Sequence, residues 1–170
     1  MKTKKQKELI DSFLLPLGAE DQALYREIVI YLSELGYNPK KERSHISFKH
    51  SLHNKQIVKI ARKKNKDGAP FLALRFSACR EYSQKFAEVV RTAINKFPSK
   101  TAKCLDSKCD YCAGEPESHV YTYTFSDGKT QSHCGAQALE IPNITAESLA
   151  EIKQLIEEEH EYLIKYEANT

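Results

Sequence analysis

Apolar residues recur at helical spacing in four segments of the chain. In residues 19–36 they are Leu24, Ile28, Tyr31, Leu32 and Leu35. Gly36 then stands where a helix ends in a left-handed residue, and glycine adopts that conformation most easily. The same spacing recurs in residues 3–15, 81–98 and 145–166. We therefore predict four helices, the third of which ends at a proline.

The segments between these helices have residue compositions typical of β-strands. Residues 44–50, 56–63 and 70–78 are short, rich in β-branched and aromatic residues, and separated by polar turn segments. Connections this short cannot make parallel crossovers, so they predict a three-stranded antiparallel meander. The order of elements predicts an α+β fold, with a mostly antiparallel sheet and helices packed on one face.

A further β-hairpin is predicted in residues 119–136, because Asp127-Gly128 lies between two alternating segments. If these two residues form the whole turn, Tyr121 lies opposite Cys134, and directly opposed residues share a face. Cys134 would then lie on the aromatic side of the hairpin, where a closed, water-poor site could form. His133 would point away from that site.

Four of the five cysteines, Cys104, Cys109, Cys112 and Cys134, lie in or just before this hairpin. Two intervening residues let the sulfurs of Cys109 and Cys112 point at one ion, and a distant strand commonly supplies the other ligands of such sites. We predict that these four thiolates bind one Zn²⁺ and staple the C-terminal hairpin, with His119 as a reserve ligand. A closed four-thiolate shell leaves no position for substrate, so the metal is expected to be structural rather than catalytic.

Two other kinds of chemistry fit the same cysteines less well. The spacing of Cys104, Cys109 and Cys112 also occurs in plant-type 2Fe–2S ferredoxins, but the residues between the first two include no glycine. A redox role for Cys109 and Cys112 needs a helix starting at the motif, where a glycine and a proline follow instead.

Cys79, between a predicted strand and a predicted helix, could be a reactive thiol, although a lone buried cysteine is commoner.

Charge divides the chain into two parts that we expect to pack as one domain. Residues 1–103, the basic α+β core, carry 22 Lys and Arg against 10 Asp and Glu. Residues 104–170, the cysteine-rich hairpin and the last helix, carry 4 against 13. The basic part could attract a nucleic acid or an acidic protein, or simply the acidic part of the same chain. The sequence shows neither a membrane-spanning run nor a secretory signal, which predicts a cytoplasmic protein.

The residues "CLDSKCDYC", "YTYTFSDGKTQSHCG" and "IPNITAESLAEIKQLIEEEHEYL" resemble the C-terminal part of small bacterial proteins classed as a domain of unknown function. The cysteine arrangement is also similar to zinc-ribbon segments, although a full ribbon has two Cys-x-x-Cys pairs and Cys134 stands alone here. The resemblance implies a metal-binding segment but no activity. We expect a metal-binding protein that acts as a binding or adaptor module rather than as an enzyme. The alternatives are a nucleic-acid-binding protein and a thiol-based redox protein or enzyme.

Overall fold

The computed structural model describes residues 3–63, 68–106, 109, 112 and 114–167. Its main feature is a five-stranded sheet in the order β1-β2-β3-β4-β7, in which every neighbouring pair is antiparallel. These strands are β1 (Tyr37–Lys41), β2 (Ile46–His50), β3 (Gln56–Arg62), β4 (Pro70–Leu74) and β7 (Leu139–Ile141). A separate two-stranded ribbon is formed by β5 (Tyr121–Thr124) and β6 (Thr130–His133).

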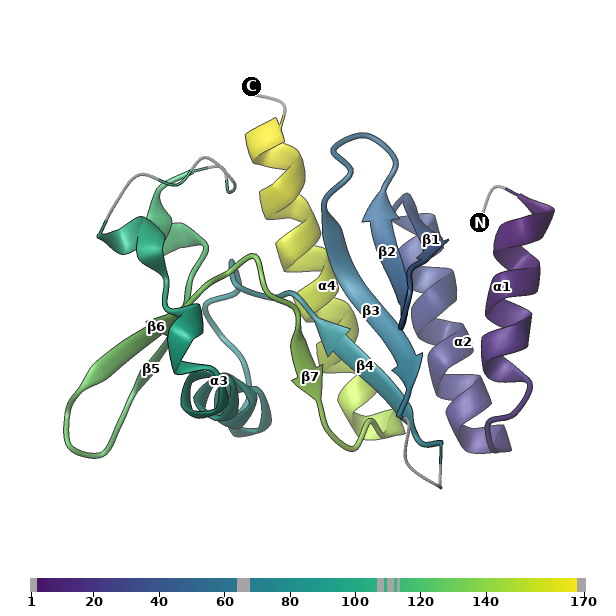
Figure 1. The fold of residues 1–170 in the computed structure, drawn as a ribbon, viewed down its shortest axis with the longest axis horizontal. Coiled ribbons are helices and arrows are strands. Elements are labelled where there is room, and N and C mark those ends of the chain that lie inside the picture. Colours follow the sequence, from purple (N-terminus) through teal and green to yellow (C-terminus); the bar gives the residue numbers. More distant parts are fainter. Residues whose placement is uncertain (1–2, 64–67, 107–108, 110–111, 113, 168–170) are drawn as a thin grey trace.

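In the described part of the chain, four α-helices flank these sheets (Figure 1). They are α1 (Lys4–Leu14), α2 (Ala19–Glu34), α3 (Gln84–Lys96) and α4 (Ala146–Glu167). Helices α2 and α4 lie behind the sheet in Figure 1, and α1 packs against α2 and β1. Helix α3 instead contacts β7, β5 and β6, so it fills the space between the sheet and the ribbon. The prediction of an α+β fold with a mostly antiparallel sheet is confirmed, although α3 lies beside the sheet edge rather than among the other helices.

The two faces of the sheet differ because side chains alternate along each strand. Phe48 lies opposite Val58, which lies opposite Leu74, and all three are fully buried. On the other face, Lys40, Ser47, Lys59 and Ala73 are paired in one row across four strands. We call this second side the open face, because no described helix crosses the front of β2, β3 and β4 in Figure 1. Lys40 is exposed and Lys59 is half-buried, whereas Ser47 and Ala73 are buried.

Helix boundaries follow local chemistry that the sequence contains. Thr3 caps α1 through a reciprocal capping box with Gln6, with hydrogen bonds of 3.1 and 3.2 Å. Gly36, just after α2, has φ +91°, as the left-handed position predicts. None of the helices in the described part of the chain is long and apolar enough to cross a membrane.

The predicted meander is confirmed as β2, β3 and β4, but two strands were not predicted. Strand β1 contains Pro39, which lacks an N–H and is tolerated there because β1 is an edge strand. Strand β7 has three residues, too few for alternation to stand out. It joins β4 across a gap of more than sixty residues that includes α3 and the ribbon.

Candidate metal centre

The four cysteines predicted to bind metal lie in irregular backbone around the β5–β6 ribbon. Cys104 lies in a short 3₁₀ helix, η2 (Lys103–Leu105), and Cys134 directly follows β6. Cys109 is exposed, and Cys104, Cys112 and Cys134 are half-buried. None of the described residues between 104 and 118 is fully buried. This segment therefore has no apolar core of its own to hold it in place.

The hairpin register differs by one residue from the prediction. Tyr121 lies opposite His133, not opposite Cys134. The loop has three residues rather than two, because the Phe125 N–H donates to the carbonyl of Lys129 at 2.8 Å. Gly128 takes the left-handed position, with φ +81°, that closes a three-residue hairpin loop.

This one-residue shift exchanges the faces of β6. His133 was predicted to point away from the aromatic side, and this is wrong: it is 2 % exposed and its ring lies 6.4 Å from that of Tyr121. Cys134 lies just beyond the last ribbon pair. Its position is therefore set by the segment that packs beside β6 rather than by Tyr121.

That neighbouring segment is joined to the ribbon by an isolated β-bridge. Thr101 forms an antiparallel bridge with His133, and the Cys134 N–H donates to the carbonyl of Lys100 at 2.9 Å. The chain continues from Thr101 directly into η2. This pairing therefore brings Cys104 and Cys134 to the same end of the ribbon.

Two glycines hold the remaining parts of the cysteine segment against the core. A Cβ atom on Gly135 would overlap the carbonyl oxygen of His119 and lie 2.9 Å from Cβ of Ser77. A Cβ atom on Gly114, which has φ +81°, would lie 2.7 Å from Oη of Tyr162 on α4. Only glycine permits these approaches, which place Gly135 beside His119 and Gly114 beside α4.

The four thiols are close enough to influence one another electrostatically. Burial raises the pKa of the Cys104 thiol, and repulsion from Cys109 and Cys134 thiolates raises it further. Burial likewise raises the pKa of Cys112, with added repulsion from the other three thiolates. We call these four residues the thiol cluster, because their charges influence one another although they come from three separate parts of the chain.

A buried ion pair lies beside this cluster. Nε of Arg75, which follows β4, is 2.6 Å from Oε1 of Glu159 on α4, and the two side chains are 3 % and 0 % exposed. Burial would lower the pKa of Arg75, but the Glu159 carboxylate and then the Cys112 thiolate raise it instead. The Arg75 guanidinium in turn acts to lower the pKa of Cys112, against the effect of burial. Arg75 therefore places a fixed positive charge near the thiol cluster.

Neither partner of this ion pair was identified from the sequence, although a signal was present. Glu159 lies between Ile156 and Leu163 on the buried stripe of α4, at helical spacing from both. Arg75 interrupts the apolar run of β4 and the residues that follow it. A charged residue at a core position of an amphipathic pattern predicts a buried partner of opposite charge.

The chemistry of these residues fits a thiolate-binding metal, although the thiols are not gathered at ligand distance. Within the described residues, no three Cys, His, Asp or Glu side chains lie close enough together to hold a metal ion. His119, the predicted reserve ligand, is 2 % exposed, and its Nε2 atom is buried without a hydrogen-bond partner among the described residues. Its Nδ1 atom lies 3.2 Å from Oη of Tyr162. A buried ring nitrogen without a partner is the type of atom that metal coordination can satisfy.

Cys79 lies apart from the thiol cluster in chemical character. Its side chain is 4 % exposed, and its Sγ atom donates to the carbonyl of Leu155 at 3.4 Å. Burial raises the pKa of Cys79 far above that of an ordinary thiol. A thiol of this kind is unreactive at neutral pH, which argues against Cys79 as a nucleophile.

A second cluster of titratable side chains lies where α4 crosses the sheet. The rings of His50 and His53 stack with centroids 4.3 Å apart, and the ring of His160 lies 5.4 Å from that of His50. Nδ1 of His160 is 3.3 Å from Oη of Tyr37. Burial lowers the pKa of His160, and His50 lowers it further. Burial thus favours the neutral form of His160, and the buried His50 ring joins this cluster to the core.

Comparisons with known protein families, with curated proteins and with solved structures find no match to this chain. The zinc-ribbon-like character of the cysteine segment remains a prediction from its residues.

Proposed function

We propose that this protein binds one Zn²⁺ through Cys104, Cys109, Cys112 and Cys134, and that it acts as a binding or adaptor module. One observation carries the proposal: the described residues from 104 to 118 include three of the four cysteines but no fully buried residue, and the charges of Cys104 and Cys112 interact with those of Cys109 and Cys134. Thiolates this close together repel one another. A divalent cation would remove that repulsion and supply the stability that the missing core does not.

The donor set favours zinc over other metals. Four thiolates at about 2.3 Å in a tetrahedron complete the coordination shell of Zn²⁺ and leave no position for water or substrate. The ion is therefore structural, and it orders residues 104–136 rather than performing chemistry. Iron in a 2Fe–2S cluster is the alternative occupant of the same four thiols.

Arg75 has a defined part in this proposal. Four thiolates around one Zn²⁺ leave a net charge of −2, and a half-buried site needs nearby positive charge to offset it. The guanidinium of Arg75 supplies that charge, and its ion pair with Glu159 fixes its position. The core of the fold thus orients a charge toward a segment that has no core of its own.

Cobalt titration tests the proposal, because Co²⁺ can replace Zn²⁺ and its absorption spectrum reports tetrahedral thiolate coordination. The chelator-treated, reduced protein is expected to bind one Co²⁺ with thiolate charge-transfer bands. Replacing Cys104, Cys109, Cys112 or Cys134 by Ser should weaken binding by more than the roughly 10- to 100-fold that loss of an outer-shell partner costs. Cys79→Ala is the matched control and should leave affinity unchanged. Equal affinity of the wild type and Cys134→Ser would refute the four-cysteine site.

His119→Gln distinguishes the reserve ligand from the four cysteines. If the four thiolates fill the shell, this substitution leaves the cobalt spectrum unchanged. A spectrum that shifts in His119→Gln but not in Cys134→Ser would replace the fourth cysteine by the histidine.

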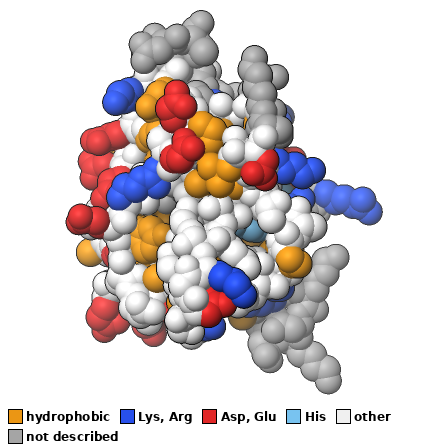
Figure 2. Space-filling view, turned by 90° about the vertical axis from the view of Figure 1, so that its left-hand side faces the viewer, with side chains coloured by type: hydrophobic (Ala, Val, Ile, Leu, Met, Phe, Trp, Pro, Cys, Tyr) orange, Lys and Arg blue, Asp and Glu red, His pale blue; other side chains and the backbone are white. Residues whose placement is uncertain are grey.

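The open face of the sheet favours nucleic-acid binding as a second candidate function. Lys40 and Lys59 are two strands apart in one row, and neither forms an ion pair among the described residues. Lys49, on the same face, is paired with Glu42 at 3.5 Å. On the ribbon side, by contrast, acidic and basic side chains are intermixed (Figure 2). The free lysines of the open face are thus placed to contact phosphates.

Salt dependence tests this second candidate. Binding to a single-stranded oligonucleotide should weaken steeply with salt, with a logarithmic slope of about −0.7 per phosphate neutralised. The double variant Lys40→Gln/Lys59→Gln should reduce the slope by about one to two contacts. Lys4→Gln/Lys7→Gln, on exposed α1, is the control with the same loss of charge. Equal slopes for the two double variants would exclude the open face as the binding surface.

A further inference from the structure

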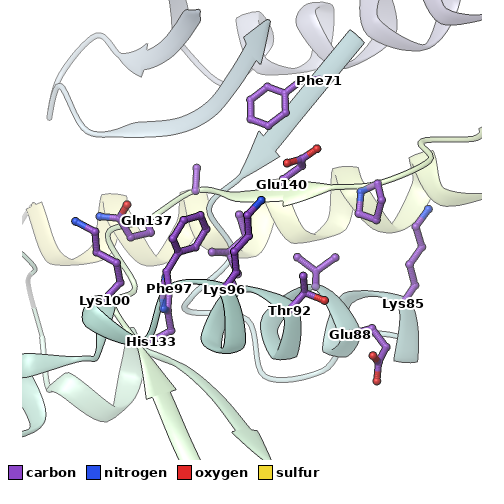
Figure 3. Close-up of a pocket in the computed structure, with 15 residues that line it drawn as sticks. Phe71, Lys85, Glu88, Thr92, Lys96, Phe97, Lys100, His133, Gln137 and Glu140 are labelled. Atoms are coloured by element: carbon purple, nitrogen blue, oxygen red, sulfur yellow. The ribbon is translucent and has the colours of Figure 1, made fainter. Parts of the chain in front are cut away.

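A cavity of about 410 Å³ lies between α3 and β7 (Figure 3). This volume falls within the range of roughly 300–1,000 Å³ that small-molecule sites occupy. One face of α3 forms a wall, because Lys85, Val89, Ala93 and Lys96 recur at helical spacing. The opposite wall comes from β7 and the segments on either side of it, with Phe71 of β4 above.

The middle of this cavity is apolar. Its buried apolar lining residues are Val89 and Ala93 on α3 and Leu139 on β7, at 5 %, 8 % and 5 % exposure. Phe71 and Phe97 contribute aromatic rings, and Phe97 is 47 % exposed. Exposed aromatic surface beside buried aliphatic groups is what an apolar ligand body would cover.

The acidic groups in the lining are already paired, whereas two of its lysines are not. Oε1 of Glu140 lies 2.7 Å from Nζ of Lys63, and Oε2 of Glu88 accepts from Nε of Arg91 at 2.6 Å. Lys63 and Arg91 are not among the lining residues. Lys96 and Lys100 form no ion pair with any described residue, and Nζ of Lys96 lies 5.4 Å from the ring centroid of Phe97. The cavity therefore has an excess of positive charge beside its apolar middle.

Polar groups converge with Lys100 at one end of the cavity. Figure 3 shows Lys100, Gln137, Phe97 and His133 together at that end. The backbone of Gln137 is fixed from two sides, because its carbonyl accepts from Oη of Tyr121 at 2.9 Å and its N–H donates to the carbonyl of Cys134 at 3.1 Å. The amide side chain of Gln137 thus extends from a rigid backbone beside a lysine without an ion-pair partner. An ammonium group next to an amide is suited to bind a carboxylate.

We propose that this cavity binds a small carboxylate with an apolar body, independently of the metal. The carboxylate lies between Lys100 and Gln137, Lys96 adds a second positive charge, and the apolar body lies against Val89, Ala93 and Leu139. A cationic ligand with the same apolar body would be repelled by Lys96 and Lys100, which have no ion-pair partner among the described residues. A neutral ligand with the same body gains only the apolar contacts.

Phenylbutyrate and phenylbutylamine are matched probes, since they share an apolar body and differ in the sign of the head group. Calorimetric titration should show one phenylbutyrate per chain and no measurable binding of phenylbutylamine at the same concentrations. Amide NMR shifts caused by phenylbutyrate should be confined to α3, β7 and residues 133–138. Equal binding of the two probes, no binding of phenylbutyrate, or shifts spread over the whole protein would each overturn the proposal.

Substitutions locate the two parts of the ligand. Lys96→Gln/Lys100→Gln removes surface charges without touching the core and should weaken phenylbutyrate binding by at least about tenfold. Ala93→Phe fills the middle of the cavity and should abolish binding in a protein whose circular dichroism is unchanged. Lys4→Gln/Lys7→Gln is the charge-matched control on α1 and should bind as the wild type does. Unchanged affinity in Lys96→Gln/Lys100→Gln would refute the assignment even if Ala93→Phe failed to fold. Cobalt binding of all these variants should be normal, which separates this proposal from the metal site.

Discussion

Breaking the Arg75–Glu159 ion pair should destabilise the fold strongly, whereas removing both charges together should cost much less. The two side chains are 3 % and 0 % exposed, with Nε and Oε1 2.6 Å apart. Oε2 of Glu159 also accepts from the Ala78 N–H at 2.8 Å. Arg75→Met leaves the carboxylate buried without its countercharge. Glu159→Gln leaves the guanidinium in that position, although the amide oxygen can still accept from Ala78.

The expected magnitude follows from burial and distance. Two unit charges about 4 Å apart attract by about 4 kcal/mol at an effective dielectric constant of about 20. Removing one partner of a buried pair costs about 3–5 kcal/mol, because the other charge stays buried alone. Replacing both partners by uncharged groups of similar size avoids that penalty. The double variant should therefore be at least about 3 kcal/mol more stable than the sum of the single effects predicts.

Urea unfolding followed by far-UV circular dichroism measures the free energy of unfolding of the wild type, the two single variants and the double variant. The exposed pair Lys153–Glu27, with the same 2.6 Å separation but side chains 31 % and 52 % exposed, is the matched control. Its cycle, Lys153→Met with Glu27→Gln, should give a coupling energy below about 1 kcal/mol. If the Arg75 and Glu159 substitutions are additive within about 0.5 kcal/mol, the two charges do not form a buried pair and the reasoning fails.

Three further substitutions test the packing and the titration of the core. Gly135→Ala places a methyl group in space filled by backbone and should lower the free energy of unfolding by about 1–3 kcal/mol or more. Gly18→Ala is the control, because no atom lies within 4 Å of the added methyl group, and it should change that free energy little. Equal effects of the two substitutions would contradict the close approach at Gly135. Tyr121→Phe removes a buried hydroxyl that both accepts and donates a hydrogen bond, and it should cost about 1–3 kcal/mol in the same assay. Burial and His50 lower the pKa of His160 in the folded protein, so the unfolded chain takes up the proton first and stability falls as the pH drops below about 6.5. His160→Gln should make the loss of stability between about pH 7 and pH 5 smaller, and an unchanged pH profile would exclude this contribution.

Helices and the central meander could be predicted because they depend on local periodicity and local caps. The capping box at Thr3 and the left-handed Gly36 are decided by neighbouring residues alone. Strand β7 could not be predicted in the same way, because three residues form a strand only when β4 supplies the hydrogen bonds. Glu159 was not identified as a buried residue because its partner, Arg75, is distant in sequence.

The hairpin illustrates how one ambiguous turn changes a site. Asp127-Gly128 fits both a two-residue and a three-residue loop, and only the Phe125–Lys129 pairing distinguishes them. The choice moves every side chain of β6 to the other face. In the observed register His133 is therefore buried on the same face as Tyr121, and Cys134 lies beyond the last pair of the ribbon. The choice of the four cysteines themselves rests on their spacing, which does not depend on the register.

Elemental analysis of the purified protein, combined with the reactivity of its thiols, tests the metal site most directly. The proposal predicts a colourless protein with one zinc per chain, in which Cys104, Cys109, Cys112 and Cys134 react with a thiol reagent only after a chelator is added. A protein without metal whose four thiols react at once would contradict it. A brown, iron-containing protein would assign the same cysteines to an iron–sulfur cluster instead.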